Sequence, residues 1–193
     1  MRLWRTGWLV LGCLVGVTAL AAPPPGRTPH IDDTTHLLPP IPGDQDALEA
    51  KLADFEARSG IKILVEFRER SPSAEEDKVP GVYMRTLAAR EGTLQHGVLV
   101  VYFLPDTDWR IWVGDELASR FAGKPGTVKQ LTASGAIHEV KEALLAAAAD
   151  RADAGFLTVK KSLPGDEMPG ADIKLRLQTE AIIDGLIAKF SAK

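Results

Sequence analysis

The clearest hydrophobic pattern in the chain lies over residues 97–114, where two strands of different character follow each other. Residues 97–104 are apolar throughout, which is typical of a strand that is buried on both faces. The turn-forming residues Pro105 to Asp108 come next, and apolar side chains then fall on one face over 109–113. The pattern predicts that the strand over 97–104 lies in mid-sheet with helices above and below it, and that the two strands form an antiparallel hairpin at the heart of an α/β layered structure.

Similar patterns predict the elements on both sides of this hairpin. Residues 61–67 alternate between apolar and polar side chains, which indicates a strand that is buried on one face only. Apolar residues at helical spacing predict helices in the other segments, namely from 44 to Gly60, from 82 to near Gly92, and over 116–121, 128–131, 137–149 and 173–190. Residues 155–158 are predicted to form a short additional strand.

The composition is that of a globular protein. The chain has 193 residues, of which 45% are hydrophobic and 25% charged, with a net charge of -3. This length is enough for one domain with a full core, and no basic stripe suggests binding to nucleic acid. A Pro- and Gly-rich stretch over residues 22–43 is expected to form an extended arm, and residues 44–193 to form a single α/β domain.

The N-terminal residues have the pattern of a secretory signal peptide. Two arginines precede a short apolar run over 8–20, and a small-x-small pattern ends at Ala21. A membrane anchor is the alternative, but the run is short of the roughly 20 residues that a span requires. Cys13 would be the site of a lipid if the run were a lipoprotein signal, and it is the only cysteine. We therefore predict removal of residues 1–21 and a periplasmic or secreted product without disulfides.

Two pairs of polar residues resemble known reaction or metal motifs. Asp106 and Asp108 resemble the aspartate pair of haloacid-dehalogenase-like phosphatases, but a turn rich in aspartate is the simpler interpretation. His138 and Glu142 lie one helical turn apart, as in a metal pair. The zinc-protease pattern requires a second histidine there, so we interpret this segment as a solvated helix face.

Four carboxylates are the strongest candidates for a binding site. Asp32 and Asp33 precede the first helix, whereas Asp115 and Glu116 follow the strand at 109–113. In an α/β fold ligands gather beyond the carboxyl ends of strands. If the arm folds back, the four would meet and would bind a hard cation such as calcium, which takes about six to eight oxygen ligands. The alternative is that the first pair caps a turn and the second caps a helix. His30 and His36, in the arm, are interpreted as surface residues.

Several segments, in order along the chain, resemble the TPM domain family. Residues 31–38 hold an aliphatic-x-Asp segment followed by paired leucines, and residues 58–65 place Ser-Gly before a strand. Residues 97–116 hold a Gly-Val-Leu strand, a charged turn and a strand that ends in Val-Gly and an acidic residue. The chain departs from the family at 114–118, where a second glycine and a glutamate of the usual pattern are absent.

The resemblance implies a three-layer α/β/α sandwich with a small mixed central sheet that contains the 97–114 hairpin. It also implies an exported accessory or interaction module that assists a complex of the cell envelope and binds calcium in some members. A weak metal-dependent acid phosphatase is the alternative. Because hydrolase motifs are missing, we favour the module. Its expected partner is an envelope or membrane-associated protein complex, with no nucleic acid and no transmembrane segment in the mature chain.

Overall fold

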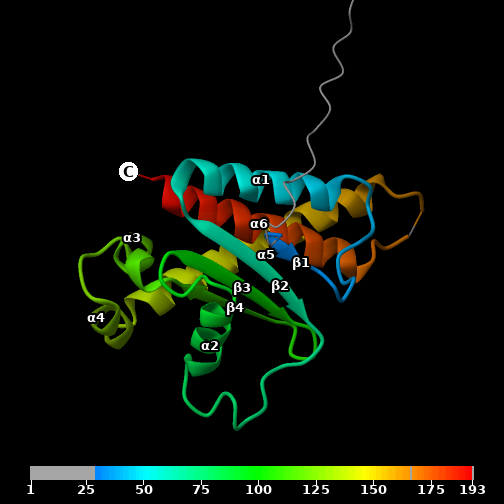
Figure 1. Ribbon diagram of the computed structural model, residues 1–193. Coiled ribbons are helices and arrows are strands. Elements are labelled where there is room, and N and C mark those ends of the chain that lie inside the picture. Colours follow the sequence, from blue (N-terminus) through cyan, green and yellow to red (C-terminus); the bar gives the residue numbers. More distant parts are fainter. Residues whose placement is uncertain (1–28, 166, 193) are drawn as a thin grey trace, which may run out of the picture.

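The computed structural model describes residues 29–165 and 167–192. Within this part of the chain, four strands alternate with helices of very different lengths (Figure 1). The elements are β1 (Ile31–Asp32), α1 (Asp44–Ser59), β2 (Lys62–Arg68), α2 (Val82–Arg90), β3 (Gly97–Phe103), β4 (Asp108–Val113), η1 (Asp115–Leu117), α3 (Ala118–Ala122), α4 (Val128–Ala133), α5 (Ala136–Ser162) and α6 (Ala171–Ser191).

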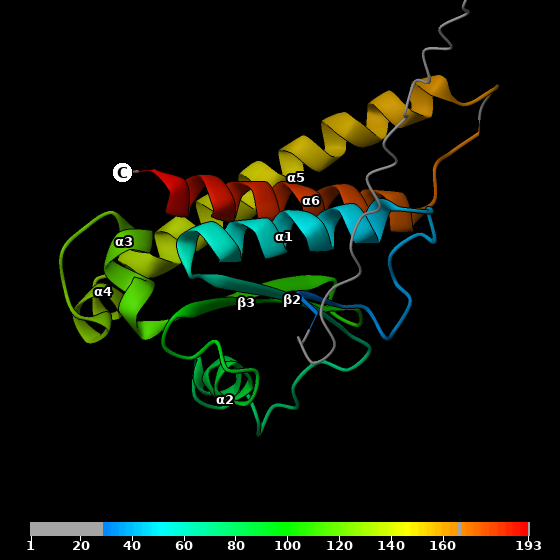
Figure 2. The same ribbon diagram turned by 45° about the horizontal axis from the view of Figure 1, so that its top comes forward.

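The fold has three layers. Figure 2 shows α1, α5 and α6 on one side of the sheet and α2 on the other, with α3 and α4 near one end of the sheet. Leu52 of α1 and Ile183 of α6 belong to the larger core with one face of the strands, and Met84 and Leu87 of α2 belong to the core on the other face. The predicted α/β/α sandwich with a small mixed sheet is confirmed.

The strand order is β1-β2-β3-β4. The first three strands are parallel, and β4 pairs antiparallel with β3, so that Val100 lies opposite Ile111. The two strands are joined by a tight turn in which the backbone N–H of Thr107 donates to the carbonyl of Leu104 at 3.2 Å. The predicted hairpin is therefore confirmed. β4 is an edge of this sheet, and no described strand pairs with its outer side.

β2 is buried on both faces, whereas the sequence predicted burial on one. Its five inner residues are all buried, because α1 lies over one face and α2 lies on the other side of the sheet. Glu66 is only 3% exposed, and burial raises its pKa although Arg68 opposes the shift. The Arg68 guanidinium lies 2.5 Å from the Glu66 carboxylate. This ion pair between two residues of the same strand, and not contact with solvent, compensates the buried charge of Glu66.

Helix α5 is longer than predicted, and the additional strand predicted at 155–158 is wrong. The helix continues to Ser162 and packs against α6 along much of its length. Gly155 faces α6 so closely that a Cβ atom would lie 3.3 Å from Leu177 Cδ1. Local strand propensity is a weak prior, and packing against a neighbouring helix overrides it here.

The predicted signal peptide over residues 1–21 lies outside the described residues. The described part of the arm does not stay separate from the domain, because Ile31 and Asp32 form β1 and pair with Val65 and Glu66 of β2. No helix among the described residues is both long and apolar enough to span a bilayer.

Candidate functional site

The four predicted carboxylates form two pairs that the sheet keeps apart. Asp32 ends β1 at one edge of the sheet, and Asp115 follows β4 at the other edge. Because β4 is antiparallel, its last residues lie beside the start of β3, where the N–H of Gly114 donates to the carbonyl of Gly97 at 2.8 Å. The pairs therefore lie at opposite edges and opposite ends of the sheet. The expectation that the four carboxylates meet is corrected by this topology.

Asp32 and Asp33 stabilise the turn that follows β1. The two carboxylate oxygens of Asp33 accept the backbone N–H groups of Leu37 and Leu38, both at 2.9 Å. Asp32 accepts the backbone N–H of Thr34 at 3.3 Å. This is the capping role that the sequence offered as the alternative, and aspartate is well suited to it because its short side chain reaches nearby backbone donors.

Asp115 and Glu116 make ion pairs with neighbouring loops and helices. The Arg85 guanidinium donates to both Asp115 oxygens, at 3.2 and 3.0 Å, and His96 Nδ1 lies 3.2 Å from Glu116. Gly114 in front of them has room only for hydrogen, because a Cβ atom would lie 2.4 Å from the carbonyl oxygen of Gln95. Close backbone packing therefore requires a glycine at this position.

The described ranges contain no group of three or more His, Cys, Asp or Glu side chains placed to hold a metal ion. His138 and Glu142 lie 3.6 Å apart with side chains 76% and 63% exposed, so the predicted solvated helix face is confirmed. Asp106 is exposed in the hairpin turn and Asp108 bonds to Arg110 at 3.1 Å, which confirms the turn interpretation. Calcium binding stays a prediction from the sequence, but the four carboxylates expected to hold the ion do not form one site.

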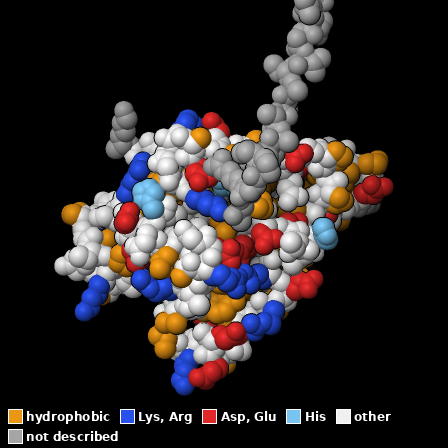
Figure 3. All heavy atoms as spheres, in the orientation of Figure 1, with side chains coloured by type: hydrophobic (Ala, Val, Ile, Leu, Met, Phe, Trp, Pro, Cys, Tyr) orange, Lys and Arg blue, Asp and Glu red, His pale blue; other side chains and the backbone are white. Residues whose placement is uncertain are grey.

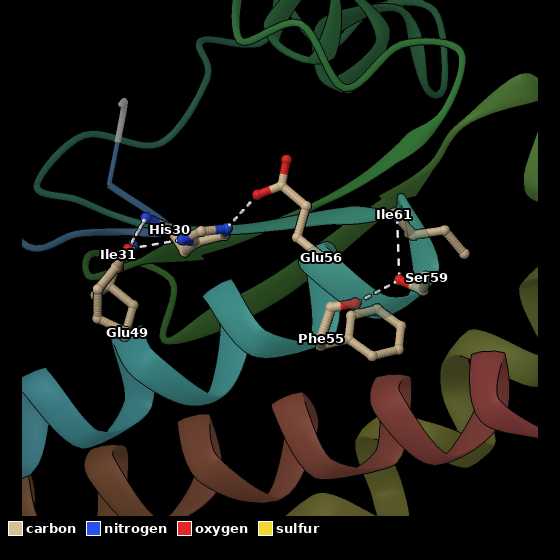
Figure 4. A network of polar contacts seen from close by, with 7 residues as sticks. All are labelled: His30, Ile31, Glu49, Phe55, Glu56, Ser59 and Ile61. Atoms are coloured by element: carbon tan, nitrogen blue, oxygen red, sulfur yellow. Dashed lines mark hydrogen bonds and ion pairs between the residues drawn. The ribbon is translucent and has the colours of Figure 1, made fainter. Parts of the chain in front are cut away.

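His30 is fully buried, whereas the sequence interpretation placed it on the surface. Figure 4 shows its ring between Glu49 and Glu56, two carboxylates spaced two helical turns apart on α1. His30 Nδ1 lies 2.6 Å from Glu49 and Nε2 lies 2.7 Å from Glu56, while Glu49 also accepts the backbone N–H groups of His30 and Ile31. This network fastens the start of β1 to α1, which is a structural role.

A groove of about 370 Å³ runs beside β4. β4 itself lines it over residues 108–113. One wall comes from α4 and α5 and includes Val128, Ile137 and Lys141, while α2 and the loop before it contribute Asp77 and Met84. The fold therefore brings three distant parts of the chain around a sheet edge that has no neighbouring strand among the described residues.

Three hydrogen-bond donors of this groove lack acceptors within the described chain, namely the indole Nε1 groups of Trp109 and Trp112 and the ammonium of Lys141. Trp109 is only 7% exposed, and no acceptor among the described residues bonds its indole Nε1. Lys141 is partly buried, and no ion pair or hydrogen bond with a described residue involves its ammonium. Burial lowers the pKa of Lys141 to about 8, although Glu142 opposes the shift. All three groups only donate hydrogen bonds, so the groove is complementary to an acceptor.

The charges on the α2 side of the groove are already paired. Arg110 donates to Asp77 at 2.9 Å and to Asp108 at 3.1 Å, and its guanidinium stacks over the ring of Phe103 at 5.2 Å. The two walls of the groove therefore differ: the one that contains α5 holds an unpaired cation, and the α2 side holds a neutralised network.

The groove could not be found from the sequence, although one of its components was visible there. The alternation over 109–113 indicates a strand with one less buried face, and the absence of a strand in the segment that follows favours an edge position. The strand that the sequence wrongly predicted at 155–158 hid this indication of an edge position. Lys141 carried no signal at all, since it lies in a charged helical segment and its burial depends on how α5 crosses β4.

The sequence was compared with protein-family models and with curated proteins, and neither comparison gave a match. On the face of the molecule in Figure 3, acidic and basic side chains are interspersed over the described surface. Among the described residues, the groove beside β4 is the candidate site that we consider further.

Proposed function

We propose that this protein is an exported accessory module, similar to TPM domain proteins, that assists an envelope protein complex by binding a segment of a partner beside β4. The observation that carries the proposal is the outer edge of β4, which pairs with no described strand and lies in a groove whose buried donors lack acceptors among the described residues. An open sheet edge is a template for pairing with another chain, and proteins usually cover such edges. The TPM-like segment 97–116 includes this same edge strand.

Export is the second part of the proposal, and it rests on the signal-peptide pattern of residues 1–21. Mass spectrometry of protein purified from the envelope fraction of the source cells tests it. The expected mass is that of a chain that begins at Ala22. An intact Met1, or a diacylglyceryl mass on Cys13, would contradict cleavage at that position.

Site-specific photo-crosslinking in the source cells tests the binding function. A photo-reactive residue is placed at His138, which is exposed at the groove, or at Lys160, which is exposed on the same helix outside it. We expect one envelope protein to be captured reproducibly from position 138 and not from position 160. Equal products from both positions, or none from either, would overturn the proposal.

A weak metal-dependent phosphatase is supported less well, because its three aspartates do not share a site. Asp32 lies at one end of the sheet and Asp115 at the other, so one metal ion cannot join them. A chromogenic phosphate ester assayed with and without divalent metal addresses this alternative. Metal-dependent turnover that Asp32→Ala abolishes in a folded protein would favour it over the binding module.

A further inference from the structure

The backbone of β4 offers a regular row of hydrogen-bonding groups to the groove. Hydrogen-bonded and non-hydrogen-bonded pairs alternate along an antiparallel ladder. The N–H of Gly114 donates to the carbonyl of Gly97, so these two residues form a hydrogen-bonded pair of the ladder. Counting back from Gly114, the non-hydrogen-bonded positions of β4 are Trp109, Ile111 and Val113, and their N–H and C=O groups point away from β3. No described backbone or side-chain group forms a hydrogen bond with them there. An extended chain has the matching two-residue spacing.

The walls of the groove select which side chains such a chain would carry. The side chains of Trp109, Ile111 and Val113 belong to the core on the α5 side, and Arg110 and Trp112 lie on the α2 side. Alternate residues of an added strand would face these same two layers. Residues toward α2 meet the neutralised Arg110 network and the indole N–H of Trp112, whereas residues toward α5 meet the layer that contains Lys141.

Two unpartnered donors define the chemistry of the α5 side. The Lys141 ammonium is partly desolvated without a carboxylate within ion-pair distance in the described residues, and the indole N–H of Trp109 is buried without an acceptor. A buried cation and a buried N–H both favour a ligand that brings oxygen acceptors. A carboxylate satisfies the lysine, and a carbonyl or carboxylate oxygen satisfies the indole.

Building on the proposed function, we propose that the partner segment is an extended acidic peptide that adds to β4 as a fifth strand and places an Asp or Glu side chain against Lys141. Main-chain hydrogen bonds to the outer edge of β4 hold the peptide, and the acidic side chain fixes its register. In the free protein no described residue pairs with the Lys141 ammonium, and in the complex the acidic side chain of the peptide pairs with it.

Selection from a displayed library of random peptides of about nine residues, a little longer than a typical strand, on the purified mature protein tests this. We expect enriched peptides to share one acidic position among β-branched and aromatic residues. Affinity for the best peptide should fall about tenfold or more when that acid becomes its amide, or when Lys141→Met removes the cation. Both changes together should cost no more than either alone. Lys160→Met, exposed on the same helix, should leave affinity unchanged.

Methylation of the peptide backbone nitrogens, one at a time, tests the pairing mode. An added strand donates every second N–H to β4, so binding should be lost at alternate positions only. Any of three results would overturn the proposal. Binding could be lost on methylation without a two-residue period, the enriched peptides could lack an acidic residue, or the protein could form a concentration-dependent dimer closed through β4. Capture from position 138 of an envelope protein whose crosslinked segment is not acidic would refute this inference alone. Absence of any capture would refute the proposed function itself.

Discussion

Replacing Lys141 by methionine is expected to stabilise the free protein. Methionine keeps an unbranched apolar chain of similar reach but removes the charge that burial penalises. In the folded state the pKa of Lys141 falls from its ordinary value of 10.5 to about 8, with desolvation as the main cause. The folded protein therefore holds this proton less tightly than the unfolded chain does, and the lysine destabilises the fold at neutral pH.

The magnitude follows from the difference in proton affinity between the two states. A difference from 10.5 to about 8 in the pKa corresponds to about 3 kcal/mol. The side chain keeps some exposure to solvent, so the expected gain from Lys141→Met at pH 7 is about 1–3 kcal/mol. Between about pH 8 and pH 10.5 the unfolded chain binds more protons than the folded protein. The stability of the wild type therefore rises with pH across this window, and the contribution of Lys141 is constant below it.

Urea denaturation of the wild type and the variant at a series of pH values measures this effect. The difference in unfolding free energy between the two proteins should be largest near pH 7 and should shrink as the pH rises toward 10.5, since other titrating groups cancel in the comparison. Lys160→Met, on the exposed part of the same helix, serves as the matched control and should change stability by less than about 0.5 kcal/mol. A Lys141→Met protein less stable than the wild type at pH 7 would refute the reasoning.

Three further predictions concern the core, the N-terminal network and calcium. Val100→Asp should prevent folding, because an unpaired carboxylate in this fully buried strand costs several kcal/mol, whereas Thr107→Asp in the exposed turn should be tolerated; a cooperative thermal melt of the first variant would contradict the central position of β3. His30→Ala should lower the unfolding free energy in urea by about 2 kcal/mol or more, because it empties a buried site and removes the imidazole contacts with Glu49 and Glu56, while exposed His36→Ala should be nearly neutral; equal effects would contradict the network. Millimolar calcium should leave the melting temperature unchanged relative to chelator, since the predicted carboxylates lie apart, and a shift of about 5–10 °C would instead show a site bound only by the folded state.

The residues of the hairpin were enough to predict its structure. An uninterrupted apolar run over 97–104 requires cover on both faces, and Pro105 to Asp108 can hardly form anything but a turn, so the layered fold follows from local chemistry. The helices over 44–59 and 171–191 were equally visible, because amphipathic spacing depends only on neighbours along the chain.

What depends on strand order could not be predicted in the same way. The four acidic residues were expected to meet if the arm folded back to the end of the strand at 109–113. Instead, Asp32 ends β1, and the antiparallel direction of β4 places Asp115 and Glu116 at the far end of the sheet. His30 is buried only because β1 pairs with β2 beneath α1, and Lys141 is desolvated only because α5 crosses the edge of β4. Local pattern predicted the hairpin strands, β2 and most helices, since those preferences act between neighbours along the chain, but it missed β1 and the continuation of α5 through 155–158. The burial and pairing of a charged side chain depend on elements that are distant in sequence, and tertiary packing alone decides them.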